Sequence, residues 1–320
     1  MTRAKVARRP KAAQGKGVAA TDHLRDGRSN VLILGSAEAG KTVYAVQFYE
    51  RTLQGGALSA TTAADDEIMI AHAREQLQQG RKPERTKSED KRTLLLDVTS
   101  AEKKTLQLRW PDYAGEDFAR ILRRRVLPAD WLPQVQAASG VILMIRPEAE
   151  RPRPDVLQRA VTEDDDDGAS IPQDAAPPPD EGQPATVPTS RQRAELQPDA
   201  TYVELLQVLR YARGEGRLTQ ADWPLLVLLS CWDEVHTTDT PADLFQERYP
   251  LLSAFVRSTW PEHLRRVNGL AALGQPLVDG DNPGIQDSPL AEQGWYIDDD
   301  GEHPDLTRPV AWLMEHIRAP

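Results

Sequence analysis

The sequence predicts an α/β fold, built on a mostly parallel sheet with one antiparallel hairpin strand and helices on both faces. Three observations favour this class. Short apolar runs suited to strands buried on both faces occur at residues 31–34, 141–145 and 224–230. Stretches with apolar residues at helical spacing lie between them. Two strand-like runs, at 93–99 and 105–110, are joined by a connection of hairpin length.

The first apolar run leads directly into a loop that reads G-x-x-x-x-G-K-T. The backbone N–H groups of such a loop surround phosphate oxygens, and the helix that follows offers the positive end of its dipole. Lys41 is therefore expected to reach the β- and γ-phosphates of a nucleotide, and Thr42 to bind Mg²⁺. The expected loop consists of Gly35, Ser36, Ala37, Glu38, Ala39 and Gly40.

The second hairpin strand runs into a D-x-x-G pattern formed by Asp112 and Gly115. An aspartate at this place holds Mg²⁺ through water, and the glycine N–H senses the γ-phosphate; a simple Asp-Gly turn is the alternative. Glu116 follows directly. It either orients an attacking water or is an acid in the first turn of the next helix, where the helix dipole favours it.

A residue just before the hairpin is expected to reach Mg²⁺ when a triphosphate is bound, and Thr86 is our choice; the alternative is an ordinary loop threonine. Arg85, beside it, is the candidate for an arginine finger that stabilises negative charge during phosphoryl transfer. Other residues considered are Ser88, Thr61 and Thr62 for the metal and Arg81 for the finger.

The stretches GSAEAGKT, DYAG and SCWD, with the helix, hairpin and second motif in this order, resemble the Ras-like, translation-factor-related branch of the P-loop GTPases. The WPDYAGEDF stretch and the ending GWYIDDDGEHPDLTRPVAWLMEHI look more specifically like the bacterial double-GTPase domains. The resemblance covers about residues 30–316, apart from an acidic insert. It implies GTP or GDP and Mg²⁺ as ligands.

The resemblance also implies a base-reading site after residues 224–230. Asp233 stands where Ras-like GTPases carry the aspartate that accepts hydrogen bonds from guanine N1 and N2; a loop-capping aspartate is the alternative. Cys231 replaces the lysine that normally packs along the base, which keeps an ATP-using enzyme open. Leu273 falls where guanine-binding loops present backbone N–H groups to O6.

Composition divides the chain into a basic tail at 1–29, and a single domain at 30–320 that is interrupted by an insert at about 151–199. The first thirty residues carry a net charge of +6, and such a tail either contacts nucleic acid, an anionic membrane or an acidic partner, or is solvated. The insert is acidic and Pro-rich, with a net charge of −8 over residues 148–199, and is expected to be disordered.

The remaining composition limits the function classes. A formal charge of −10 argues against nucleic-acid binding over the whole surface. The single cysteine excludes an intrachain disulfide and a cysteine-based zinc site. No secretory signal and no apolar run of membrane-spanning length occur, so a cytoplasmic protein is expected.

These observations lead to the hypothesis of a GTP-dependent molecular switch. Hydrolysis is expected to be slow, because the Glu116 carboxylate repels the γ-phosphate. The double-GTPase resemblance implies a bacterial conflict or defence system, with a second GTPase or an effector protein as partner. The alternatives are an ATP-using P-loop NTPase and a nucleotide-bound interaction module that does not hydrolyse.

Overall fold

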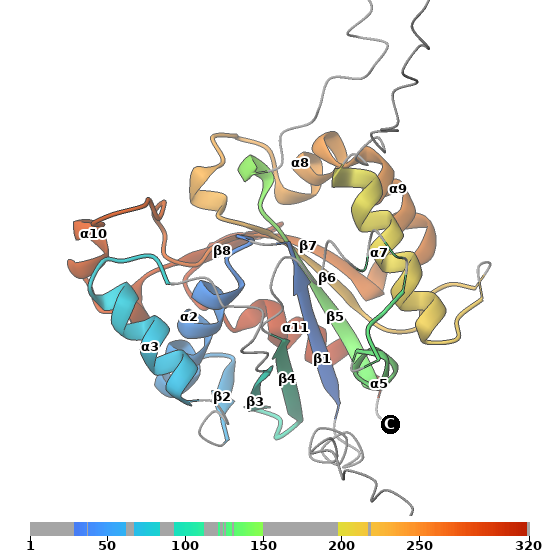
Figure 1. The fold of residues 1–320 in the computed structure, drawn as a ribbon, viewed down its shortest axis with the longest axis horizontal. Coiled ribbons are helices and arrows are strands. Elements are labelled where there is room, and N and C mark those ends of the chain that lie inside the picture. The colour runs from blue at the N-terminus through green and yellow to red at the C-terminus, as the bar shows by residue number, and fades with distance from the viewer. Residues whose placement is uncertain are drawn as a thin grey trace, which may run out of the picture.

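The fold was analysed in a computed structural model of the chain (Figure 1). The structure describes residues 29–36, 38–61, 67–83, 93–111, 121, 124, 126–129, 131–149, 198–216 and 219–318. In chain order, the elements are β1 (Asn30–Gly35), α2 (Lys41–Gln54), β2 (Leu58–Ala60), α3 (Glu67–Gln78), β3 (Thr93–Ser100), β4 (Thr105–Pro111), α5 (Leu132–Ala137), β5 (Ala138–Ile145), η1 (Pro147–Ala149), α7 (Pro198–Ala212), β6 (Leu225–Ser230), η2 (Trp232–Glu234), α8 (Pro241–Arg248), α9 (Pro250–Thr259), η3 (Glu262–Leu264), β7 (Arg265–Ala271), α10 (Pro283–Gln286), η4 (Leu290–Glu292), β8 (Trp295–Asp298), β9 (Gly301–His303) and α11 (Arg308–His316).

The described strands form one mixed sheet of nine strands in the order β2-β3-β4-β1-β5-β6-β7-β8-β9. The five central strands β4, β1, β5, β6 and β7 are parallel to their neighbours within that group. The outer strands β3, β2, β8 and β9 pair antiparallel. The prediction of an α/β fold is confirmed, but the sheet contains more antiparallel strands than the one expected.

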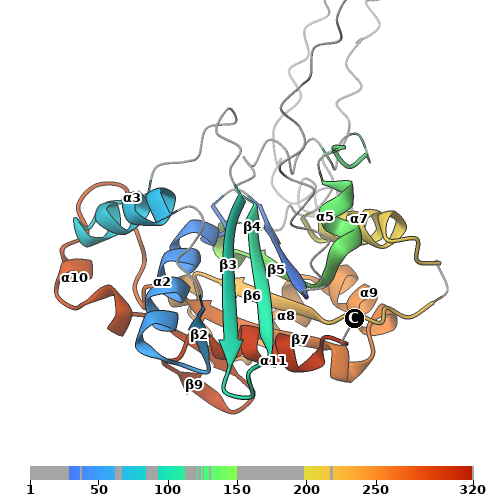
Figure 2. The same cartoon turned by 90° about the horizontal axis from the view of Figure 1, so that it is seen from below.

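Helices cover both faces of the sheet because the central strands are apolar on both faces. Figures 1 and 2 show α2, α3 and α10 on one side and α5, α7 and α9 on the other. In β1, Val31 and Ile33 face the first helix group, and Leu32 and Leu34 face the second. The period of two along an apolar run thus divides the interior into two cores.

The first core places α2 firmly beside the hairpin strand β4. Tyr44 and Phe48 of α2 and Trp110 of β4 are buried, with ring centroids 5.5 to 5.8 Å apart. Aromatic pairs at such distances add to the stabilisation that burial itself provides. The Tyr44 hydroxyl donates to the Leu306 carbonyl at 3.1 Å, which fixes the helix from its other side.

The sequence-based boundaries of the main elements agree with the structure to within a few residues. The strand-like runs expected at 31–34, 93–99, 105–110, 141–145 and 224–230 are β1, β3, β4, β5 and β6. The three-residue strands β2 and β9 were not expected. They lie at the two edges of the sheet, where pairing with a neighbouring strand decides whether so short a segment is extended.

The expected basic tail, the residues after β4 and most of the acidic insert lie outside the described residues. The elements on either side of the insert nevertheless belong to one sheet. In β5, Val141 pairs with Leu225 of β6, and Ile145 pairs with Leu229.

The parallel central strands end along one edge of the sheet, because they all run in the same direction. In α/β sheets of this kind, ligands bind beyond the carboxyl ends of the strands. At this edge lie the glycine-rich loop after β1, Arg146 after β5, Cys231 after β6 and the turn after β7.

Candidate nucleotide-binding site

The glycine-rich loop between β1 and α2 packs closely against the end of β5. A Cβ atom on Gly35 would lie 2.6 Å from the carbonyl oxygen of Met144, so a side chain there would force the two strands apart. At the other end of the loop, Gly40 has a left-handed backbone (φ 72°), a conformation that glycine adopts without steric cost. Glu38 is also left-handed (φ 67°), which is strained for a residue with a side chain.

Lys41 begins α2 and folds back over this loop. Its Nζ donates to the carbonyl oxygens of Gly35 at 2.9 Å and Ser36 at 2.7 Å. The first turn of α2 contains no acidic residue, and no side chain caps its N-terminus. The positive end of this helix and the Lys41 ammonium therefore act together at the loop, an arrangement that favours a phosphate.

Thr42 is the second residue of α2 and is partly buried. Its hydroxyl makes no hydrogen bond with any described residue. Mg²⁺ usually takes only one or two protein oxygens and fills its other positions with water and substrate phosphates. The uncommitted hydroxyl beside the phosphate loop therefore suits the predicted metal role.

The Ser-Cys-Trp-Asp motif lies directly beside the glycine-rich loop. The Ser230 hydroxyl donates to the Ile145 carbonyl at 3.0 Å and ties the ends of β5 and β6 together. Cys231 then turns the chain with a left-handed backbone (φ 52°), and its Sγ lies 3.8 Å from where a Cβ would stand on Gly40. The tertiary structure thus brings together two motifs that are far apart in the chain.

Trp232 anchors this turn on the neighbouring strand. A Cβ added to Gly269 of β7 would lie 2.6 Å from the Trp232 ring, so the indole fits only over a glycine. Trp232 is buried, and Cys231 and Asp233 on either side of it are partly buried. The position of Asp233 is therefore set by packing of the residue before it.

The charges of the turn follow from burial. Burial raises the pKa of Cys231 to about 12, so the thiol stays neutral and supplies no charge in place of a lysine. Burial also raises the pKa of Asp233 to about 6, partly offset by its own backbone N–H and by Arg146. Among the described residues no other group donates a hydrogen bond to the Asp233 carboxylate, so its oxygens remain available to a ligand.

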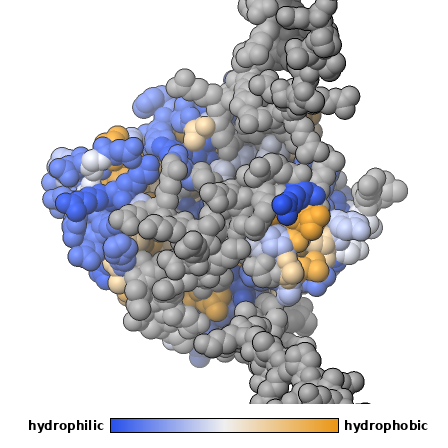
Figure 3. All heavy atoms as spheres, viewed as in Figure 1, coloured by the Kyte–Doolittle hydropathy of each residue, from blue (hydrophilic) through white to orange (hydrophobic). Residues whose placement is uncertain are grey.

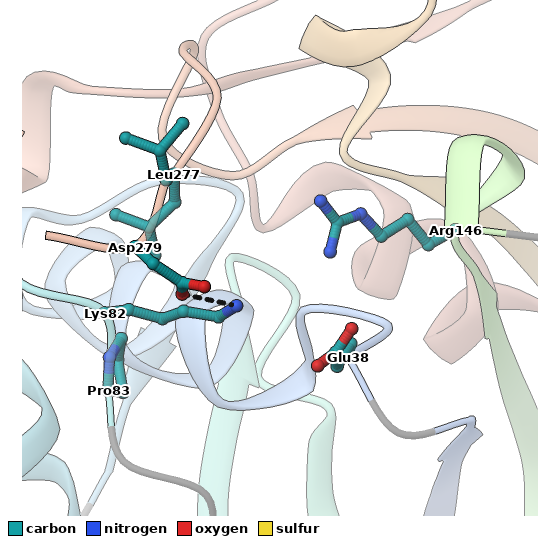
Figure 4. A pocket seen from close by; sticks show the side chains of 7 residues that line it. Glu38, Lys82, Pro83, Arg146, Leu277 and Asp279 are labelled. Carbon is teal, nitrogen blue, oxygen red and sulfur yellow. Dashed lines mark hydrogen bonds and ion pairs between the residues drawn. The ribbon is translucent and has the colours of Figure 1, made fainter.

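An open cavity of about 680 Å³ adjoins the loop (Figure 4). Arg146, after β5, reaches into it from one side, while Lys82 and the segment 277–279 lie on the other, with Glu38 of the loop below. Lys82 and Asp279 form an ion pair of 3.3 Å. In Figure 3, hydrophilic side chains cover the surface over α3 and α10. In the chain, α3 comes before Lys82, and α10 follows residues 277–279.

Arg146 is held by Glu234 from the turn after β6. Its Nε donates to Oε2 at 2.9 Å and its Nη2 to Oε1 at 2.6 Å, a bidentate contact. This hydrogen bond raises the pKa of Arg146 above its usual value. The pair joins the cavity to the turn that carries Asp233.

The other predicted site residues are placed as follows. Leu273 is buried in the first core and belongs to a turn that is closed by the Gly274 N–H donating to the Ala271 carbonyl at 3.2 Å. The Thr61 hydroxyl donates to the Asp97 carbonyl at 3.1 Å, at the end of edge strand β2. The predicted residues that lie outside the described part of the chain are Ala37, Thr62, Arg85, Thr86, Ser88, Asp112, Gly115 and Glu116.

Several cavity residues were not singled out from the sequence: Lys82, Pro83, Arg146 and residues 277–279. Glu234, which binds Arg146 from outside the cavity lining, was not singled out either. Arg146 was within reach of prediction. It directly follows a buried strand, at the strand end where α/β proteins bind ligands. Lys82 and residues 277–279 carry no local signal, because they belong to loops that meet only in the folded chain.

The fold is of the α/β class, and the glycine-rich loop, the N-terminus of α2 and the Lys41 contacts with Gly35 and Ser36 lie together at one end of the sheet. The family model described as Double-GTPase 1 matches residues 32–313, and the chain belongs to this family. The resemblance to the double-GTPase domains seen in the sequence is therefore confirmed, and the family description suggests a GTP-binding domain. The comparison with curated proteins finds no match. In the described part of the chain, no helix is long and apolar enough to cross a membrane.

Proposed function

We propose that the protein is a Mg²⁺-dependent GTP-binding switch that hydrolyses GTP slowly. The observation that carries this proposal is the close approach of the glycine-rich loop and the Ser-Cys-Trp-Asp motif. Cys231 Sγ lies 3.8 Å from where a Cβ atom would stand on Gly40. A phosphate-binding loop and a potential base-reading aspartate lie at the same end of the sheet. One nucleotide could therefore engage both.

The strand order supports a Ras-like arrangement. The antiparallel hairpin β3-β4 lies beside β1 on one side, and β5, β6 and β7 follow on the other. In this arrangement Asp112 and Gly115, directly after β4, would come to the carboxyl end of the sheet beside Lys41 and Thr42. Thr42, with Asp112 through water and Thr86, would hold Mg²⁺.

Hydrolysis would proceed by attack of water on the γ-phosphate. The bond from the γ-phosphorus to the bridging oxygen of GDP breaks, a bond to the water oxygen forms, and the water proton passes to the phosphate product. Lys41 and the backbone of residues 35–40 would bind the phosphates, Arg85 would stabilise developing charge, and Glu116 would orient the water. The negative charge of Glu116 beside the γ-phosphate is the reason to expect a slow intrinsic rate.

We further propose a role in a bacterial conflict or defence system in the cytoplasm, with a second GTPase or an effector protein as partner. This part of the proposal rests on the kind of locus in which double-GTPase domains occur. The basic tail at 1–29 and the acidic insert at about 151–199 are the segments expected to meet partners other than the nucleotide.

The binding experiment compares nucleotides on the purified protein. Displacement of a fluorescent GDP analogue by GDP and by ADP should favour GDP, and the nucleotide that co-purifies should be a guanine nucleotide. Lys41→Ala should weaken GDP binding at least about tenfold, because a charge-assisted contact to phosphate is lost. Lys104→Ala is the matched control, since among the described residues the Lys104 ammonium pairs only with the exposed Glu102 at 2.9 Å, in the hairpin turn.

The outcomes separate the competing functions. Equal displacement by ADP and GDP would favour the ATP-using enzyme, which Cys231 keeps open. Unchanged GDP binding in Lys41→Ala would refute the phosphate site. Single-turnover assays with and without co-encoded proteins then measure hydrolysis, and GTP that persists in both would indicate an interaction module that does not hydrolyse.

A further inference from the structure

We propose that Arg146 stacks against the purine base of the bound nucleotide and so determines base affinity. This inference rests on the proposed function, because it assigns a role within the same nucleotide site. It concerns a residue that the sequence motifs do not contain. Arg146 follows β5 directly and lines the cavity beside the glycine-rich loop (Figure 4).

The first argument is the geometry of the guanidinium. Glu234 binds Nε and Nη2 of Arg146 at 2.9 and 2.6 Å, which leaves Nη1 and the flat face of the group uncommitted to that contact. The Arg146 side chain is 21 % exposed. A guanidinium held in one plane stacks on aromatic rings with little further loss of freedom.

The second argument is the charge balance. Glu234 neutralises Arg146 within the pair, so Arg146 is poorly suited to be a second phosphate clamp. The phosphate end already has Lys41 and the N-terminus of α2. A planar, partly buried guanidinium whose charge is balanced by Glu234 is better matched to the face of a base than to a phosphate.

The third argument is the opposite side of the cavity. Pro83, Leu277 and Val278 line it and present apolar surface, and Val278 is 57 % exposed. Figure 4 shows Leu277 and Pro83 on the side of the cavity opposite Arg146. A flat apolar base fits between such a surface and a guanidinium.

The fourth argument is the location. Glu234, which orients Arg146, directly follows Asp233, the residue expected to read the base edge. Cys231 in the same turn is a neutral thiol because burial raises its pKa to about 12. Arg146 thus supplies, from a neighbouring strand, the flat guanidinium group that the turn itself lacks.

The experiment measures displacement of a fluorescent GDP analogue by GDP and by tripolyphosphate, which has neither base nor ribose. In Arg146→Ala, GDP affinity should fall about tenfold, whereas tripolyphosphate affinity should stay within about twofold of the wild type. Arg146→Lys should remain impaired for GDP, because lysine keeps the charge but not the plane. Glu234→Gln should give an intermediate loss, since Glu234 acts by positioning Arg146.

The matched control is Arg248→Ala, which removes a similar pair, Arg248 Nη1 to Glu148 Oε1 at 2.7 Å, outside the cavity lining. It should bind GDP as the wild type does. Thermal melting accompanies each variant, and the ratio of the two affinities does not depend on the folded fraction. Equal loss of GDP and tripolyphosphate binding, or unchanged GDP binding, in Arg146→Ala would overturn the inference. Failure of the wild type to bind any guanine nucleotide would instead refute the proposed function.

Discussion

Replacing Asp233 by asparagine should stabilise the nucleotide-free protein at neutral pH while impairing its base selection. Burial raises the pKa of Asp233 to about 6, whereas an aspartate in an unfolded chain titrates near 3.9. The shift is therefore about two units, and each unit corresponds to about 1.4 kcal/mol. The full shift would destabilise the native state by about 3 kcal/mol, and partial exposure of the side chain reduces this to about 1–2 kcal/mol.

The sign follows from the protonation states. Below pH 4 the carboxyl group is protonated in both the folded and the unfolded chain, so it adds no pH dependence there. Between pH 4 and 6 the unfolded chain loses this proton first, and the cost of the buried charge is complete above about pH 6. Asp233→Asn should thus raise the free energy of unfolding more at pH 8 than at pH 5.

Urea unfolding of the nucleotide-free wild type and variant at pH 5 and pH 8 measures this difference. The same pair of proteins tests the base contact, because an asparagine amide can donate where a carboxylate only accepts. The variant should lose preference for GDP and gain preference for XDP. GDP affinity of the wild type should also fall as the pH drops through about 6, and the variant should lack this dependence.

An equal stability change at both pH values, or destabilisation at pH 8, would refute the assignment of a costly buried charge to Asp233. Unchanged preference between GDP and XDP would refute its role in reading the base. These two outcomes are independent, because the first measures the protein without ligand and the second compares two ligands.

Two further substitutions test the packing of the fold. Gly35→Ala should destabilise the protein by about 1–3 kcal/mol and weaken nucleotide binding, because its Cβ would lie 2.6 Å from the Met144 carbonyl oxygen. Urea unfolding measures the loss of stability. Gly216→Ala is the control, because its Cβ would make ordinary contacts at 3.6 Å. Asp199→Ala should cost about 1–3 kcal/mol, because the buried carboxylate accepts two hydrogen bonds of 2.6 and 2.8 Å from the first turn of α9. Unchanged midpoints in urea would contradict either prediction.

The glycine-rich loop, for which we propose a phosphate-binding role, could be read from local sequence because its geometry is local. A strand, two glycines, a lysine and a threonine at fixed spacing determine where backbone N–H groups and the ammonium lie. The structure adds the reason for the first glycine, which is the close approach of Met144. It also shows that Lys41 already folds over the loop to Gly35 and Ser36.

The cavity could not be read in the same way. Its lining comes from Glu38, Lys82, Arg146 and residues 277–279, which are distant in sequence and have no shared pattern. The parallel arrangement of β1, β5, β6 and β7 brings Glu38, Arg146 and residues 277–279 to one end of the sheet. Lys82, which follows α3, joins them through its ion pair with Asp279. The two short edge strands were missed for a related reason, since a three-residue strand is stabilised by its partner rather than by its own side chains.

The sequence by itself determined the α/β class, the glycine-rich loop from Gly35 to Thr42 and the position of Asp233 after a buried strand, because periodicity and motif spacing are local properties. The family membership rests on the same motifs and is confirmed over residues 32–313. The tertiary structure decided which distant side chains face one another. It placed Cys231 beside Gly40 and held Arg146 against Glu234 at the cavity, because contacts across a sheet depend on strand order and register.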